Sequence, residues 1–121
     1  MTTPAHPTIQ ADFVWHDGKL VPYAEARTHV TAFTLHYGLG VFEGLRCYRR
    51  ADGRSAIFRL REHVERLFAS ARTTAMDLPF APAAIEAACL ETVRANRLAE
   101  AYVRPLGFTG AGVLGMGARS R

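Results

Sequence analysis

The protein has 121 residues and a mass of 13.3 kDa, the size of a single domain. Hydrophobic residues make up 49% and charged residues 21%, which is typical of folded globular proteins and unlike disordered chains. The formal net charge is +4, and Lys19 is the only lysine among the 15 basic side chains. No apolar run approaches the roughly 18 residues of a membrane span, and we expect no signal peptide and a cytoplasmic location.

The first predicted elements are two β-hairpins. Short apolar runs flank Asp17-Gly18, and an Asp-Gly pair in that position favours the tight turn of a hairpin. Residues 24–38 follow with no regular pattern, and short extended or helical pieces are expected there. Residues 40–50 then predict a strand, which a second Asp-Gly pair at 52–53 turns back into a partner strand over 55–59.

Two helices and one strand complete the predicted order. Apolar residues recur at the spacing of one helix face from Leu60 to Ala71, and Pro79 ends this helix. Pro82 suits the first turn of a second helix, which ends near Asn96. Residues 101–109 predict a strand that Pro105 kinks or confines to an edge.

This order predicts an α+β fold in which two helices cover one face of a mostly antiparallel sheet. We expect a mobile leader over residues 1–11, a small domain over 12–109 and a glycine-rich, linker-like tail over 110–121.

The residues that carry chemistry are arginines rather than metal ligands or nucleophiles. Histidines and cysteines lack the spacing of converging metal ligands, so no metal site is predicted. Serine is scarce and no nucleophile motif occurs. Arg104, however, stands inside the apolar run Ala101–Leu106, and a guanidinium in such a place is either exposed at an edge or directed at a carboxylate or phosphate.

Five short motifs together resemble the fold-type IV pyridoxal-phosphate enzymes, and within them the branched-chain amino-acid aminotransferases. They occur in the family's order and at compatible spacing: Trp15-His16-Asp17-Gly18, His36-Tyr37-Gly38, Val41-Phe42-Glu43-Gly44-Leu45-Arg46, Glu62-His63-x-x-Arg66-Leu67 and Tyr102-Val103-Arg104-Pro105-Leu106. The resemblance covers residues 12–115 and implies the small N-terminal domain of such an enzyme.

The resemblance also implies a cofactor, pyridoxal 5'-phosphate, and roles for single residues. Arg66 matches the family arginine that binds the cofactor phosphate. Positions that line the substrate pocket are matched by Tyr37, Phe42, Arg46, Tyr102 and Arg104. Their apolar members suit a branched side chain, and Arg104 with the tyrosine hydroxyls suits the carboxylates of an amino acid or 2-oxo acid.

One family feature has no match in this sequence. The family's Schiff-base lysine, which holds the cofactor, lies in a second, larger domain, and Lys19 follows the turn of a predicted hairpin instead. We therefore assign no catalytic residue and expect the 121-residue chain to be inactive alone. The intact enzyme is expected to exchange an amino group between Leu, Ile or Val and 2-oxoglutarate, and to be a homo-oligomer.

Two other readings remain open on the sequence. The same fold also serves D-amino-acid aminotransferases and aminodeoxychorismate lyases. A non-catalytic module that binds anions is the second alternative, since the net charge is +4. Basic residues do not cluster beyond Arg49-Arg50, so neither nucleic acid nor a membrane is expected as a partner.

Overall fold

A computed structural model describes residues 11–111 of the protein. The chain begins with the hairpin of β1 (Phe13–His16) and β2 (Lys19–Pro22), whose register pairs His16 with Lys19. Asp17 and Gly18 both have positive φ angles, 49° and 100°, as the tightest hairpin turns require. A short 3-10 helix (Tyr23–Glu25) and the one-turn helix α1 (Phe33–Tyr37) follow within the stretch that gave no regular pattern.

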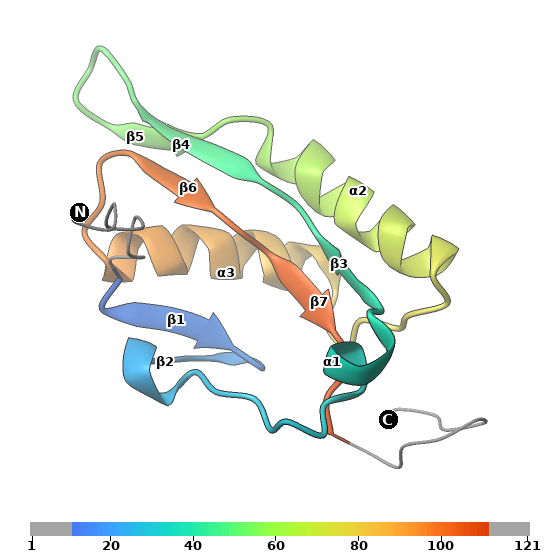
Figure 1. Ribbon diagram of the computed structural model, residues 1–121. Coiled ribbons are helices and arrows are strands. Elements are labelled where there is room, and N and C mark those ends of the chain that lie inside the picture. The colour runs from blue at the N-terminus through green and yellow to red at the C-terminus, as the bar shows by residue number, and fades with distance from the viewer. Residues whose placement is uncertain (1–10, 112–121) are drawn as a thin grey trace, which may run out of the picture.

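Two long antiparallel runs form the centre of the fold, and each is interrupted once. The first run contains β3 (Gly40–Phe42) and β4 (Leu45–Arg49), and the second contains β6 (Ala101–Val103) and β7 (Leu106–Phe108). β3 pairs with β7, and β4 pairs with β6 and, on its other side, with β5 (Ser55–Ile57). Figure 1 shows the two runs side by side, with α3 crossing behind them.

The interruption explains why the predicted strands 40–50 and 101–109 each appear as two. Pro105 has no backbone N–H and so cannot donate to the ladder at this point. Its carbonyl oxygen still accepts a hydrogen bond of 3.0 Å from the backbone N–H of Glu43. The two runs therefore remain joined across the gap. Successive side chains of the first run continue to point to opposite faces through it.

Two helices cover the inner face of these runs, as the sequence predicts. They are α2 (Leu60–Thr73) and α3 (Pro82–Ala95), which starts with Pro82 in its first turn. One core cluster joins β3 to α2 and the loop after it through Val41, Leu67, Ala71 and Met76. Leu45 and Val64 are fully buried. The mixed α/β architecture with antiparallel pairing is thus confirmed, although the strands form three small sheets instead of one.

Asn96, at the C-terminal end of α3, fastens the first hairpin to the rest of the fold. Its side-chain Oδ1 accepts hydrogen bonds from the backbone N–H groups of Asp12 (2.7 Å) and Phe13 (3.0 Å). Its Nδ2 donates to the carbonyl oxygens of Phe13 (2.9 Å) and Thr92 (2.8 Å). One amide side chain therefore sets the position of β1 against α3.

The expected leader and tail lie almost wholly outside the described residues, which exclude 1–10 and 112–121. The division into leader, domain and linker stays a prediction. Within residues 11–111, no helix is long and apolar enough to cross a membrane.

Candidate functional site

Alternation along the first central run sorts its side chains onto two faces. Val41, Glu43 and Leu45 are buried, whereas Phe42 and Arg46 are exposed on the opposite face. Glu43 is the only buried charged residue of the described part of the chain, with 5% of its surface exposed. The two faces carry two different clusters.

The outer cluster, which we call the aromatic–arginine patch, consists of Phe42, Arg46, Tyr102 and Arg104. The guanidinium of Arg104 lies 4.3 Å from the ring centroid of Phe42 and 5.3 Å from that of Tyr102. Its Nη2 donates a 2.8 Å hydrogen bond to the Tyr102 hydroxyl oxygen. Arg46, directly opposite Tyr102 in the β4–β6 register, lies 5.7 Å from the same ring.

Gly44 makes this arrangement possible. A Cβ at position 44 would overlap the hydroxyl oxygen of Tyr102 and would lie 2.8 Å from its ring carbon Cζ. Real Cβ atoms essentially never approach that closely. The Tyr102 ring thus occupies the space that a side chain would fill, and from there its hydroxyl reaches Arg104. Glycine is needed here for space rather than for a special backbone angle.

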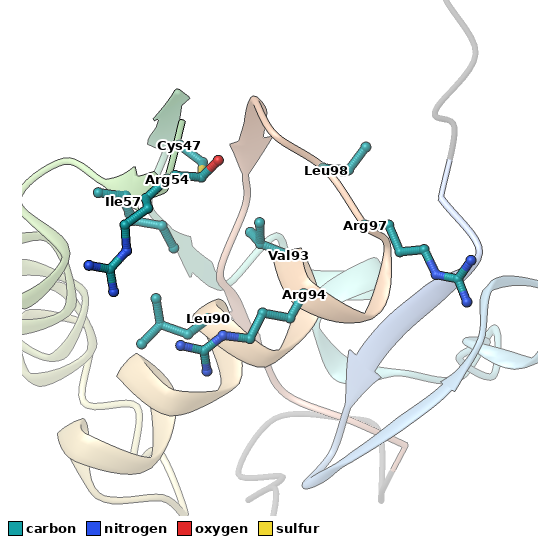
Figure 2. Close-up of a pocket in the computed structure, with 10 residues that line it drawn as sticks. Cys47, Arg54, Ile57, Leu90, Val93, Arg94, Arg97 and Leu98 are labelled. Carbon is teal, nitrogen blue, oxygen red and sulfur yellow. The ribbon is translucent and has the colours of Figure 1, made fainter. Parts of the chain in front are cut away.

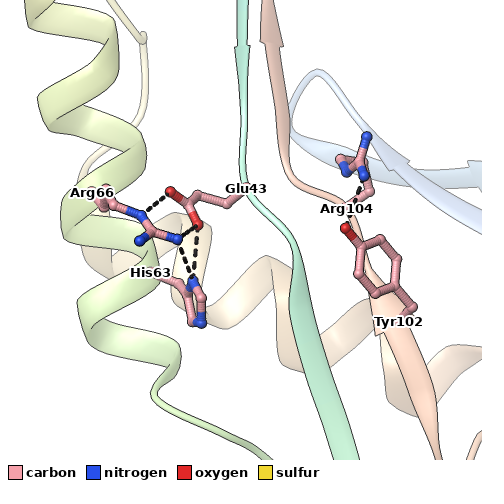
Figure 3. A network of polar contacts seen from close by, with 5 residues as sticks. All are labelled: Glu43, His63, Arg66, Tyr102 and Arg104. Carbon is pink, nitrogen blue, oxygen red and sulfur yellow. Dashed lines mark hydrogen bonds and ion pairs between the residues drawn. The ribbon is translucent and has the colours of Figure 1, made fainter.

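The inner cluster consists of Glu43, His63 and Arg66, and Figure 3 shows Glu43 turned toward α2 to meet the other two. Arg66 donates from Nε to Glu43 Oε1 (2.6 Å) and from Nη2 to Oε2 (2.8 Å). His63 Nδ1 lies 2.8 Å from the same Oε2. The Arg66 side chain is 67% exposed and that of His63 23%, so these two side chains shield the carboxylate from solvent.

The electrostatics of the inner cluster keep Glu43 ionised, and its geometry indicates the tautomer of His63. The hydrogen bonds from Arg66 lower the pKa of Glu43, and burial opposes this effect. Together with the hydrogen bond from His63, they bring the pKa from 4.5 to about 2. The carboxylate is therefore ionised at neutral pH and can only accept hydrogen bonds. His63 must then carry a proton on Nδ1, because that nitrogen faces Oε2. The same contacts raise the pKa of Arg66 further above its ordinary value.

Four of the six candidate site residues meet in the aromatic–arginine patch, and the other two lie elsewhere. Tyr37 belongs to α1, where its ring packs at a tilt of 39° against that of Phe33, with centroids 4.5 Å apart. Arg66 belongs to the inner cluster. Tyr102 and Arg104 belong instead to the second strand run, β6–β7, which lies beside the β3–β4 run on the side away from Arg66 (Figure 3). Sequence reasoning did not find the pairing of Glu43 with His63 and Arg66. The signal was present, since a lone acid stood at an inward position of an apolar strand.

A further concavity opens between β5 and the end of α3, with a volume of about 340 Å³. Apolar side chains, one serine and three arginines line it: Cys47, Ala56, Ile57, Leu90, Val93, Leu98, Ser55, Arg54, Arg94 and Arg97. Figure 2 shows Arg97 directed away from the concavity. Among the described residues no buried polar side-chain atom lacks a hydrogen-bond partner.

The two cysteines lie in the described part of the chain, and both are buried. Burial raises the pKa of the Cys47 thiol and, for Cys89, raises it to about 11, so both thiols stay protonated at neutral pH. No three His, Cys, Asp or Glu side chains in residues 11–111 lie where they could hold a metal ion.

Comparison with known proteins places both clusters in a family context. The family model described as amino-transferase class IV matches residues 40–120, two thirds of the chain. The chain belongs to the class IV aminotransferases. This is a family of pyridoxal-phosphate-dependent transferases, and the matched segment holds the whole inner cluster and the whole aromatic–arginine patch.

Two curated relatives show what the chain is similar to within this family. The chain is 48% identical over 103 residues to the branched-chain-amino-acid aminotransferase of Pseudomonas aeruginosa, covering 85% of this chain and 33% of that protein. It is 41% identical over 110 residues to the enzyme of that name from Escherichia coli K12, covering 91% and 35% respectively. The chain thus spans about a third of the length of the curated relatives it matches.

Solved structures agree with this assignment. A bacterial branched-chain amino acid aminotransferase (T.th.), complexed with N-(5'-phosphopyridoxyl)-L-glutamate, superimposes with a TM-score of 0.86 at 47% identity, covering 89% of this chain and 36% of that one. The Escherichia coli branched-chain amino acid aminotransferase gives a TM-score of 0.86 at 38% identity, covering 91% and 37%. The fold-type IV fold of the small domain is thereby confirmed.

Proposed function

We propose that this chain supplies the phosphate anchor and much of the substrate pocket of a branched-chain amino-acid transaminase. The reaction would move an amino group between Leu, Ile or Val and 2-oxoglutarate, with pyridoxal 5'-phosphate as cofactor. The observation that carries the proposal is the Arg104 guanidinium, held between two aromatic rings and hydrogen-bonded to a tyrosine hydroxyl on an exposed face. The names and ligands of the relatives support it.

The aromatic–arginine patch offers both features that a branched-chain amino acid needs. A carboxylate can accept hydrogen bonds from the N–H groups of Arg104 that remain beside the one given to Tyr102. The rings of Phe42 and Tyr102, 58% and 53% exposed, and Leu106, which pairs with Phe42, present apolar surface next to that charge. A branched aliphatic side chain would cover this surface and exclude water from it.

The residues present also fit the phosphate of the cofactor. A guanidinium has five N–H donors; two of those of Arg66 are given to Glu43, and Nη2 also lies 3.5 Å from His63 Nδ1, which leaves the two N–H groups of Nη1 for a phosphate. The side chain is 67% exposed, so a ligand can reach these donors from solvent. When bound, the cofactor supplies the electron sink that stabilises the carbanion at the substrate Cα. In this proposal Arg66 binds the phosphate of the cofactor, and Arg104 orients the carboxylate of the substrate.

The proposal gives Lys19 no role in the transamination reaction. It lies at the start of β2, opposite His16 in the hairpin, and is exposed. Figure 1 shows the β1–β2 hairpin, to which Lys19 belongs, and α2, to which Arg66 belongs, on either side of α3. We expect no transamination by the 121-residue chain alone. Turnover by that chain that Lys19→Ala abolishes would contradict this expectation.

Substrate binding tests the role of Arg104. We propose to titrate the labelled chain with 4-methyl-2-oxopentanoate, the 2-oxo acid of leucine, and to follow the Arg104 and Tyr102 side chains by NMR. Arg104→Gln should weaken binding roughly 10- to 100-fold, because one charge-assisted contact is worth about 1.5–3 kcal/mol. Arg61→Gln, on the exposed face of α2, should leave it unchanged. Equal binding by both variants would refute the assignment.

Turnover tests the reaction itself. The product of the complete gene should transaminate L-leucine with 2-oxoglutarate and should show little activity toward D-alanine. The reverse preference would select the D-amino-acid enzymes of the same fold. Homo-oligomeric assembly and a cytoplasmic location also remain part of the proposal, and size-exclusion chromatography with light scattering of the same product tests the first of them.

A further inference from the structure

Glu43 contacts one particular edge of the Arg66 guanidinium. The carboxylate accepts from Nε and Nη2, the pair of donors along the side of the group. At the other edge, Nη2 also lies 3.5 Å from His63 Nδ1, whereas the N–H groups of Nη1 make no hydrogen bond within residues 11–111 and are open to another partner. Arginine binds carboxylates and phosphates bidentately through either pair. Arg66 can therefore hold Glu43 along its side and a phosphate at its end at the same time.

The surroundings keep Glu43 in this position. Its carboxylate is 5% exposed and lies on the core side of the strand run, next to the fully buried Leu45. The backbone N–H of Glu43 is itself held by the carbonyl oxygen of Pro105. Oε2 also receives the hydrogen bond of His63, which comes from the same helix as Arg66, three residues earlier. By contrast, Arg66 is mostly exposed and would otherwise be free to sample many rotamers.

We propose that Glu43, supported by His63, is a positioning residue that fixes the Arg66 guanidinium side-on, so that its free end is presented to a phosphate group. This inference rests on the proposed function, because it takes Arg66 as the phosphate anchor. A phosphate then binds to a guanidinium whose rotamer is already ordered, and ordering such a side chain on binding costs about 0.5–1.5 kcal/mol. Glu43 itself does not touch the phosphate.

The charge of Glu43 complicates a simple deletion. Glu43→Gln removes a negative charge near the phosphate, which favours binding, and also weakens the hold on Arg66, which disfavours it. Glu43→Asp separates the two effects, because the charge is kept while the shorter side chain no longer reaches both donors. Glu62→Gln is the matched control, since Glu62 is an exposed carboxylate of α2 that contacts an arginine, Arg59, outside the cluster.

The probe is pyridoxine 5'-phosphate, which has no aldehyde and so cannot react with lysine, and pyridoxine is the probe without phosphate. Binding of both to the full 121-residue chain is followed by NMR. Glu43→Asp should weaken binding of the phosphorylated probe about 2- to 10-fold, the equivalent of the ordering cost. Arg66→Gln should abolish the difference between the two probes, and Glu62→Gln should change neither.

Each outcome addresses one claim. If Arg66→Gln removes phosphate recognition but Glu43→Asp binds as tightly as the parent chain, the positioning role is wrong and the anchor stands. If Arg66→Gln has no effect, the proposed function is wrong at its phosphate site. A second measurement needs no variant. The Nε–H resonance of Arg66 and the Nδ1–H of His63 should persist when the parent chain is saturated with phosphate probe. Their loss would mean that phosphate displaces Glu43, and would overturn the proposal.

Discussion

Acid should remove one identifiable contribution to the stability of this fold, that of Glu43. The pKa of this carboxyl is lowered from 4.5 to about 2, so its ionised form stabilises the folded chain at every pH above 4.5. The stabilisation fades as the pH falls from 4.5 to 2 and is absent below that range. A pKa change of this size corresponds to at most about 3 kcal/mol. Because Arg66 is 67% exposed, solvent screens the pair, and we expect about 1–2 kcal/mol.

The assay is urea unfolding followed by circular dichroism at several pH values between 2 and 6. The free energy of unfolding of the parent chain should exceed that of Glu43→Gln by about 1–2 kcal/mol at pH 6, and the two values should converge near pH 2. Glu62→Gln, which removes an exposed carboxylate, should follow the parent chain throughout. A constant difference between the parent and Glu43→Gln across this range would refute the assignment of the acid-sensitive contribution to Glu43.

Other predictions follow from single contacts. Gly44→Ala should move the Tyr102 ring and break its hydrogen bond to Arg104, which changed aromatic NMR shifts would report. The free energy of unfolding should fall by only about 1 kcal/mol, because the atom in the way is the end of a side chain that can move. Asn96→Ala should lower the free energy of unfolding by about 1–3 kcal/mol and shift the emission of Trp15 in β1 to the red, and an unchanged spectrum would contradict the fastening role. Cys89 should resist thiol reagents at pH 8 until denaturant is added, and mass spectrometry that finds it modified in the native chain would refute its burial.

Local signals in the sequence were sufficient for the hairpins and helices. The Asp-Gly turn at 17–18 and the proline at position 82 act within a few residues of themselves, so the pattern predicts them well. The strand over residues 40–50 was predicted as one element, yet it is divided at Glu43-Gly44. That division depends on Pro105, which meets Glu43 across the ladder from 62 positions away in the sequence. Pairing over such a distance is not encoded in a local pattern.

The candidate site shows the same division between local and distant information. Arg104 could be selected because an arginine inside an apolar strand needs an anionic partner or an exposed position. The resemblance to a family pointed to Arg66 as the phosphate anchor, but no pattern showed that Glu43 occupies one edge of its guanidinium. Alternation along the strand places Glu43 on the buried face, a feature that sequence reasoning did not use. Its partners could be found only once α2 was placed against that strand.

The central claim is that Arg66 recognises a phosphate group, and one titration tests it most directly. The labelled parent chain is titrated with pyridoxine 5'-phosphate and, separately, with pyridoxine. The account predicts that the side-chain resonances of Arg66 and His63 shift with the phosphorylated probe alone, at concentrations on the order of 10 mM, as a single charge-assisted contact implies. Shifts confined to Arg54 and Arg94 at the concavity between β5 and α3 would contradict phosphate recognition by Arg66, and so would the absence of any difference between the two probes.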